Sequence, residues 1–251
     1  MALDLEEVRS RLPGRYIRWF ASVDSTMHEA ARLAAEGCAS GTVVIADEQT
    51  AGQGRLGRSW YSEAATGLYL SVVLRYPFPT DSLAVVTMAL GIGVREAIAQ
   101  TTGLATDLRW PNDILIGDRK CAGILTHFEA GAIIAGVGLN VNQPKFPADI
   151  SDTATSLRIA SGEKQSREDL LVSILPGIDA ACELLLDEGR NAVLRLFADF
   201  SSYVSGRRVV VDLGDAELRG TTAGLNAAGF LLVRDDAGVE HTIVAGGVRP
   251  I

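Results

Sequence analysis

Apolar residues recur along the chain with two different periods, and the period changes from segment to segment. Runs rich in β-branched and aromatic residues, bounded by turn residues, predict strands at 16–23, 41–47, 67–75, 114–116, 121–129 and 132–141. Apolar residues at helical spacing predict helices at 27–36, 81–101, 166–188 and 191–204. Turn residues separate the last three strands, so we expect them to form an antiparallel meander.

The pattern changes abruptly near residue 205. Helical spacing stops at Gly206, and short alternating strands follow, separated by Gly214, Gly224, Gly229 and Gly238. Strands of this length and spacing are typical of a small β-barrel. We therefore expect two domains, residues 1–204 and 205–251, a division that a length of 251 residues also favours.

The composition is that of a folded, soluble protein, because 47% of the residues are hydrophobic and only 22% are charged. The longest apolar run, residues 83–94, is too short to cross a bilayer, which needs roughly 20 residues. Asp4, Glu6 and Glu7 stand where a secretory signal would carry positive charge. Three cysteines without a C-x-x-C pair indicate neither a disulfide framework nor a zinc site. We expect a cytoplasmic protein with reduced cysteines and no membrane segment.

The formal net charge of −8 argues against a general affinity for nucleic acid, which depends on an excess of lysine and arginine. Any anion site must therefore be local. Only three of the 23 basic residues are lysines, namely Lys120, Lys145 and Lys164. Because the chain uses arginine almost everywhere else, a retained lysine is a weak indication of chemical need.

A glycine- and arginine-rich segment, residues 49–60, follows the second predicted strand. Its hexapeptide Gly52-Gln53-Gly54-Arg55-Leu56-Gly57 matches the G-x-G-x-x-G of dinucleotide-binding folds. In those folds the glycines open a helix that holds the pyrophosphate, whereas here the chain leads into another strand. We interpret the segment as a mobile flap, with Arg55 and Arg58 facing a phosphate or carboxylate and Trp60 offering an aromatic face. A solvated hairpin loop is the alternative.

A second cluster, Arg109-Trp110-Pro111-Asn112-Asp113, places a rigid proline between an aromatic residue and two polar residues that favour turns. Shortly after it, Arg119 and Lys120 begin a predicted strand. Side chains alternate along a strand, so one of these cations can point into a site while the other meets solvent. The scarcity of lysine favours Lys120 as the inward cation, and a charged strand end is the alternative.

These segments resemble, in the same order, the signature of the biotin–protein ligase family. Its three motifs read AGQGRLGRSW (51–60), RWPNDI (109–114) and RKCAGIL (119–125) here, flanked by DST (24–26), GVGLNVN (136–142) and ATSL (154–157). The resemblance covers nearly the whole chain. It implies an α+β fold of the class II synthetase-like biotin/lipoate ligase type, with helices packed on a mixed, mostly antiparallel sheet, followed by a small SH3-like β-barrel.

The resemblance also implies an activity: an ATP-dependent ligase that forms biotinoyl-5'-AMP and transfers biotin to a lysine of a biotin carboxyl carrier domain. Lys120 and Arg55 are the implied catalytic residues. The implied biotin contacts are Ser25, Thr26, Gln49, Gly52, Gln53, Gly54, Arg55, Lys120 and Gly123. The implied ATP contacts are Arg55, Arg58, Trp60, Asn112, Lys120 and Asn140, with Asn112 and Asn140 also holding Mg²⁺.

Some positions have a plainer interpretation or depart from the family pattern. Thr26 and Glu29 have the spacing of a capping box, which needs no ligand. Gln53 stands where some members have arginine, which weakens a side-chain charge there but leaves a backbone role. Arg109 stands where the usual motif has lysine.

Two other functions fit parts of the pattern: a lipoate–protein ligase, which shares the fold, and a non-enzymatic module that binds biotin or a nucleotide. The segment before Asp24 is too short for the helix-turn-helix domain that some relatives carry, so we expect no DNA binding. An exposed sheet edge could pair two chains or dock the acceptor, so we expect a monomer or a homodimer.

Overall fold

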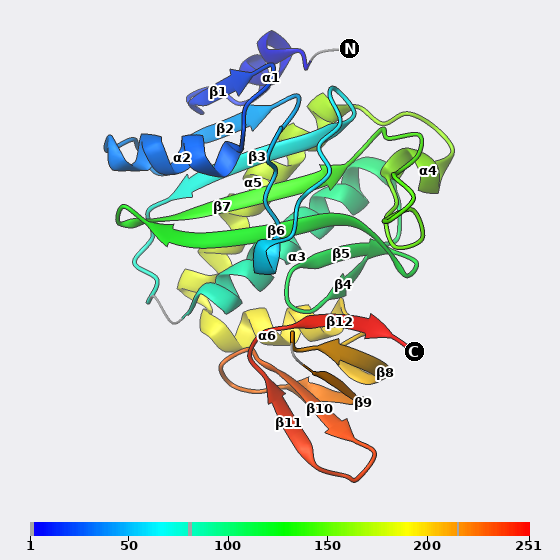
Figure 1. Ribbon diagram of the computed structural model, residues 1–251. Helices are drawn as coiled ribbons and strands as arrows, with labels where there is room; N and C mark the ends of the chain where they lie inside the picture. The colour runs from blue at the N-terminus through cyan, green and yellow to red at the C-terminus, as the bar shows by residue number, and fades with distance from the viewer. Residues whose placement is uncertain (1–2, 80–81, 215) are drawn as a thin grey trace.

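The larger of two sheets has seven strands and carries most of the fold. Its strands are β1 (Ile17–Phe20), β2 (Val43–Ala46), β3 (Gly67–Leu74), β4 (Asp107–Arg109), β5 (Asp113–Ile116), β6 (Arg119–Glu129) and β7 (Ala132–Asn140) in a computed structural model that describes residues 3–79, 82–214 and 216–251. They lie in the order β1-β2-β3-β7-β6-β5-β4 (Figure 1). Among the strands of the described residues only β1 and β2 pair in parallel, and β5, β6 and β7 form the expected antiparallel meander.

The helices agree with the hydrophobic pattern in the long segments and differ in the short ones. They are α1 (Leu5–Arg11), α2 (Thr26–Ala35), α3 (Leu83–Thr102), α4 (Leu157–Ser161), α5 (Arg167–Asp187) and α6 (Gly189–Asp199). The helix expected at 191–204 was placed too far along, because α6 ends at Asp199 and strand structure begins at Ser205, before Gly206. The start expected at Asp81 lies outside the described residues.

Helices cover both faces of the large sheet, and side-chain alternation assigns each strand residue to one face. Val43 and Val72 belong to the main core, which they share with α3 and α5. Their neighbours Val44 and Val73 point the other way and pack against α2. α3 is apolar and long enough to cross a membrane, but 67% of that stretch is buried inside the protein. It is the central helix of the main core.

The start of α2 lies beside the floor of the candidate site. Ser25 is the N-cap residue, with an extended backbone, and its hydroxyl accepts a hydrogen bond from the Met27 amide at 3.3 Å. The capping box expected from Thr26 and Glu29 is therefore wrong by one residue. Thr26 is already the first helical residue, which leaves its hydroxyl available for other contacts.

The C-terminal part forms a second, five-stranded antiparallel sheet. Its strands are β8 (Ser205–Asp212), β9 (Glu217–Leu225), β10 (Leu231–Asp235), β11 (Glu240–Ile243) and β12 (Gly247–Pro250), in the order β11-β10-β9-β8-β12 (Figure 1). Buried residues of both sheets belong to one continuous core. The domain division between residues 204 and 205 stays a prediction.

All three cysteines are free. Cys121 and Cys182 are buried, and burial raises the pKa of each thiol to about 12. Both are therefore neutral core residues.

Candidate active site

Three glycines hollow out the open face of β6 and β7. Gly123, Gly136 and Gly138 lie on this face, while their neighbours Ile124 and Val137 point into the main core. A Cβ added at Gly138 would lie 2.6 Å from Nε1 of Trp60, and one at Gly136 would lie 2.6 Å from Sδ of Met27. Since neither position has room for a side chain, the glycines form a floor against which other groups lie closely.

The flap expected at residues 49–60 extends in the structure over residues 47–66, the whole segment between β2 and β3, and it crosses this floor. Its base is held by backbone bonds, from Trp60 N to Gly52 O at 2.8 Å and from Gly54 N to Arg58 O at 2.7 Å. Its tip is a single 3₁₀ turn, Arg55–Gly57. Arg55 Nη1 then donates to Asn112 Oδ1 over 3.3 Å, which joins the flap to the turn before β5.

Two cavities lie beneath the flap and share part of their walls. The larger has a volume of about 190 Å³ and the smaller about 40 Å³. Five residues line both of them: Gly54, Arg55, Trp60, Asn112 and Lys120. Cations from the flap and from β6 therefore line the same part of the site.

The smaller cavity collects most of the residues expected to contact biotin. It is lined by Ser25, Thr26, Gln49, Gln53, Gly54, Arg55, Lys120 and Gly123, whereas Gly52 lines neither of the two cavities. Gln49 Oε1 accepts hydrogen bonds from the amide and the hydroxyl of Thr26, at 2.9 and 3.1 Å. This network fixes hydroxyl and amide groups at one end of the cavity, where they can meet a polar ring.

Gln53 reaches away from that network. Its Nε2 lies 2.7 Å from Nε2 of His28, whose Nδ1 lies 2.9 Å from Asp24 Oδ2. The position that carries arginine in some family members is therefore tied to the first turn of α2 here.

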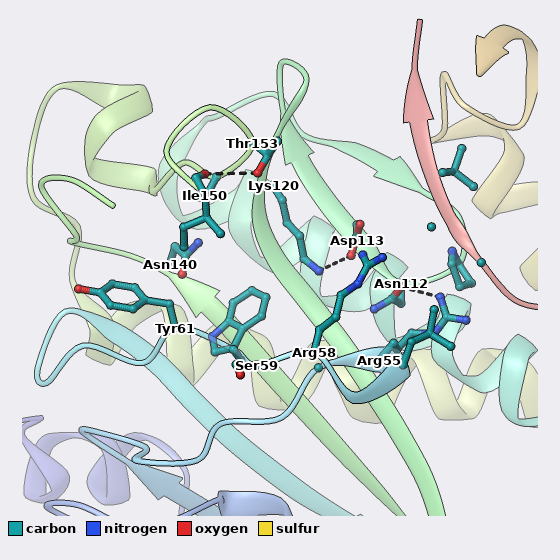
Figure 2. A pocket seen from close by; sticks show the side chains of 18 of the residues that line it. Arg55, Arg58, Ser59, Tyr61, Asn112, Asp113, Lys120, Asn140, Ile150 and Thr153 are labelled. Carbon is teal, nitrogen blue, oxygen red and sulfur yellow. Dashed lines mark hydrogen bonds and ion pairs between the residues drawn. The ribbon is translucent and has the colours of Figure 1, made fainter. Parts of the chain in front are cut away.

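The larger cavity collects every residue expected to contact ATP. They are Arg55, Arg58, Trp60, Asn112, Lys120 and Asn140. Figure 2 labels all of them except Trp60 and shows that the labelled side chains come from the flap, from the turn before β5, from β6 and from the end of β7. The flap contributes Arg55 and Arg58 to this cavity, and the sheet side contributes Lys120 and the amides of Asn112 and Asn140, a combination suited to phosphate oxygens.

Lys120 is held from two directions. Its backbone amide donates to Thr153 O at 2.7 Å, and its carbonyl accepts from the Thr155 amide at 2.9 Å. The loop between β7 and α4 therefore fixes the start of β6. Its Nζ forms an ion pair with Asp113 Oδ1, drawn as a dashed line in Figure 2. Arg119, its neighbour, is exposed, as strand alternation predicted.

Asp113 is a charged residue of the site to which the sequence analysis gave no role beyond the turn. Its second oxygen accepts from Arg109 Nη2 at 2.7 Å, so the carboxylate lies between two cations. Burial alone would raise the pKa of Asp113, but the charges of Lys120 and Arg109 outweigh it and lower that pKa below its ordinary value of 3.8. Asp113 is therefore an anion at neutral pH, and it orients the amine of Lys120.

The two flap arginines differ in their surroundings. Arg55 is partly buried, and burial lowers its pKa against the opposing effect of Asp113. Its guanidinium nevertheless remains a cation, because arginine is effectively always protonated in proteins. Arg58 also lines the larger cavity, but its side chain is 63% exposed. One cation is thus partly buried in the cavity wall, and the other lies largely in solvent.

The donor set for a magnesium ion consists of amide oxygens. No group of three His, Cys, Asp or Glu that could hold a metal occurs among the described residues. Asn112 Oδ1 receives Arg55, and Asn140 Oδ1 receives Gln143 Nε2 at 3.4 Å. Mg²⁺ accepts oxygen ligands and takes few of them from protein when phosphates supply the rest. Each of the two amide oxygens accepts one hydrogen bond and has a second lone pair, which is compatible with an ion held mainly by phosphates.

Part of the larger cavity comes from residues that the sequence analysis did not single out. They are Tyr61, Phe146, Ile150 and Thr153 on one side, and Gly246, Gly247 and Val248 of the second sheet on the other. Their chemistry is ordinary, so only the fold brings them to the site. The second sheet contributes to the cavity wall directly.

Comparison with known proteins agrees with this geometry. The family model described as "Biotin/lipoate A/B protein ligase family" matches residues 19–143, and "Biotin protein ligase C terminal domain" matches residues 204–248. A biotin--[acetyl-CoA-carboxylase] ligase of Mycobacterium tuberculosis is 32% identical over 258 residues, which cover 98% of this chain and 94% of that protein. The chain belongs to the biotin protein ligase family.

Two further similar proteins are ligases of the same family. The bifunctional ligase/repressor BirA of Bacillus subtilis is 31% identical, over 93% of this chain and 74% of that protein. A biotin protein ligase of Aquifex aeolicus, solved in complex with biotin and ATP, superposes with a TM-score of 0.83 at 30% identity, covering 94% of this chain and 100% of that one. The family, fold class and enzyme class expected from the sequence are confirmed, and the lipoate alternative is not favoured.

Proposed function

We propose that this ligase binds biotin in the smaller cavity and ATP in the larger one, so that the biotin carboxylate meets the α-phosphate where the cavities join. The observation that carries the proposal is the shared wall of Arg55, Asn112 and Lys120. A biotin carboxylate oxygen attacks the α-phosphorus, the bond to the β-phosphate breaks, and pyrophosphate leaves. The products are pyrophosphate and biotinoyl-5'-AMP.

The reacting groups are both anions, so their mutual repulsion has to be cancelled before the bond forms. Lys120 and Arg55 stand at the junction and would neutralise the carboxylate and the α-phosphate oxygens, more strongly as charge builds up in the transition state. Magnesium bound with ATP would screen the leaving pyrophosphate, with Asn112 and Asn140 as its protein ligands. Asp113 would hold the Lys120 amine at the junction.

The second step consumes the adenylate. The neutral amine of an acceptor lysine attacks the acyl carbon, the bond to AMP breaks, and the amide forms with loss of a proton from nitrogen. We propose a biotin carboxyl carrier domain as the acceptor, a role supported by the name of the Mycobacterium tuberculosis relative. The cytoplasm, which supplies ATP and reduced thiols, is the proposed location.

The flap would protect the adenylate from water until the acceptor arrives. Its glycines allow it to open and close, and its arginines give trypsin two sites, Arg55 and Arg58. We expect biotin with MgATP to slow tryptic cleavage in the flap. Equal cleavage with and without the ligands contradicts a closing flap.

The experiment that tests the function is incubation with MgATP and either labelled biotin or labelled lipoate, followed by measurement of pyrophosphate release. We expect release with biotin only. Release with lipoate only would identify a lipoate ligase, and binding without release would identify a non-enzymatic module.

A further inference from the structure

Arg58 connects the flap to the second sheet. Its Nη2 donates to Asp212 Oδ2 over 3.1 Å, and Asp212 is the last residue of β8. Arg58 also lines the larger cavity, as do Gly246 and Gly247 of the second sheet. The Asp212 carboxylate therefore binds Arg58, one of the cations that line the cavity proposed to hold ATP.

The second sheet is shaped to receive this guanidinium. Gly247 pairs with Asp212 across β12 and β8, and a Cβ added to Gly247 would lie 3.5 Å from both terminal nitrogens of Arg58. Gly246 has a φ of +152°, and a Cβ there would lie 2.8 Å from the Asp212 carbonyl oxygen. The two glycines thus keep the edge beside Asp212 free of side chains, so the arginine can lie over it.

The pair is weak enough to be exchanged. The side chain of Arg58 is 63% exposed and that of Asp212 is 35% exposed, so water screens their attraction. Triphosphate carries several charges and accepts arginine through two parallel hydrogen bonds. A nucleotide in the larger cavity would therefore bind Arg58 more strongly than the solvated carboxylate of Asp212 does.

We propose that Asp212 is the resting partner of Arg58 and competes with the phosphates of ATP for its guanidinium. The second sheet then lowers the apparent affinity of the nucleotide cavity and releases the flap arginine when ATP enters. Asp212 is a positioning residue, because it acts through Arg58 and not on substrate. The inference rests on the proposed function, since it requires ATP in the larger cavity.

The test is a double-mutant cycle on the full-length enzyme, with the KM for ATP measured by pyrophosphate release. Asp212→Asn should lower this KM about twofold to fivefold, the range open to an exposed ion pair, and leave kcat and the KM for biotin unchanged. Asp212→Asn should have no effect when Arg58 is already glutamine. Asp236→Asn is the control, because Asp236 forms another solvent-exposed ion pair, with Arg208, and neither residue lines the cavity.

The possible outcomes separate the inference from the proposed function. A higher KM for ATP in Asp212→Asn overturns the inference, because the carboxylate would then anchor the flap for ATP. A similar fall in the Arg58→Gln background also overturns it, since the effect would not pass through Arg58. If Arg58→Gln alone leaves the KM for ATP unchanged, the ATP role proposed for Arg58 is itself wrong.

Discussion

Trp110 Nε1 donates a hydrogen bond to the carbonyl oxygen of Gly229, 2.9 Å away. This bond joins the turn that carries Asn112 and Asp113 to the second sheet, and the indole is only 2% exposed. The tryptophan of the RWPND motif therefore contributes mainly to packing between the two sheets. Trp110 also lines the larger cavity, together with Asn112 and Asp113 of the same turn.

The bond gives a prediction about stability. Trp110→Phe should destabilise the enzyme by about 1 to 3 kcal/mol through the unpaired carbonyl, with a further loss from the smaller ring. Urea denaturation measures the difference. Trp19→Phe is a matched control, because the Nε1 of Trp19 is buried without a hydrogen-bond partner. Equal losses in the two variants would show that the bond to Gly229 contributes nothing.

The next prediction concerns Lys120. Lys120→Ala should slow adenylate formation roughly a hundredfold to a thousandfold, the usual effect of removing one group that stabilises transition-state charge. Pyrophosphate exchange measures this step, and thermal unfolding checks that the variant is folded. Lys164→Ala should retain full activity, because Lys164 is exposed and lines neither cavity. A near-normal exchange rate in Lys120→Ala would refute its catalytic role.

Asp113 should stabilise the fold in a pH-dependent way. Removing one partner of a buried ion pair costs about 3 to 5 kcal/mol, and we expect about 2 to 3 kcal/mol for Asp113→Asn because Lys120 is 27% exposed and partly solvated. The pKa of Asp113 is lowered in the folded protein, so its contribution is complete above the ordinary value of 3.8 and is lost as the pH falls through the lower folded value.

Urea denaturation of the wild type and Asp113→Asn across pH provides the measurement. The difference in unfolding free energy should stay constant from about pH 5 to 8 and shrink only in strong acid. A difference that already disappears near about pH 6 would mean that burial, and not the two cations, determines this pKa.

Gly138 should tolerate no side chain. A methyl group there would lie 2.6 Å from Trp60 Nε1, so Gly138→Ala should displace the indole and reduce activity roughly tenfold to a hundredfold. Tryptophan fluorescence reports the displacement independently of activity. Gly91→Ala in α3 is the control, because the nearest atom to its added Cβ is 4.0 Å away. Unchanged fluorescence and activity in Gly138→Ala would show that the indole has room to move.

Residues that stand in continuous motifs could be predicted from the sequence. Arg55 and Lys120 lie in short segments whose chemistry is visible locally, and the structure brings both to one cavity. Asp113 was also visible but was taken for a turn residue. Its role depends on the pairing of β5 with β6, which brings it beside Lys120, and on Arg109 across the turn.

Other features depended on tertiary structure that the sequence does not display. β4 has three residues, too few to show a period, and α1 buries only Val8. The choice between Ser25 and Thr26 as the cap depends on where the extended backbone ends, and both residue types cap helices well. Gly247 reaches the cavity only because β12 pairs with β8.

The two ends of the flap are fixed to neighbouring strands. β2 and β3 pair antiparallel from Val43 with Val72 to Ala46 with Tyr69. The flap leaves β2 and enters β3 at the same end of this strand pair. Opening it therefore breaks no pairing between β2 and β3, and the side-chain contacts to be broken include the single hydrogen bonds of Arg55 with Asn112 and of Arg58 with Asp212. Substrate entry in this ligase should be a local, low-cost motion of a single loop, on the timescale of loops and not of whole domains.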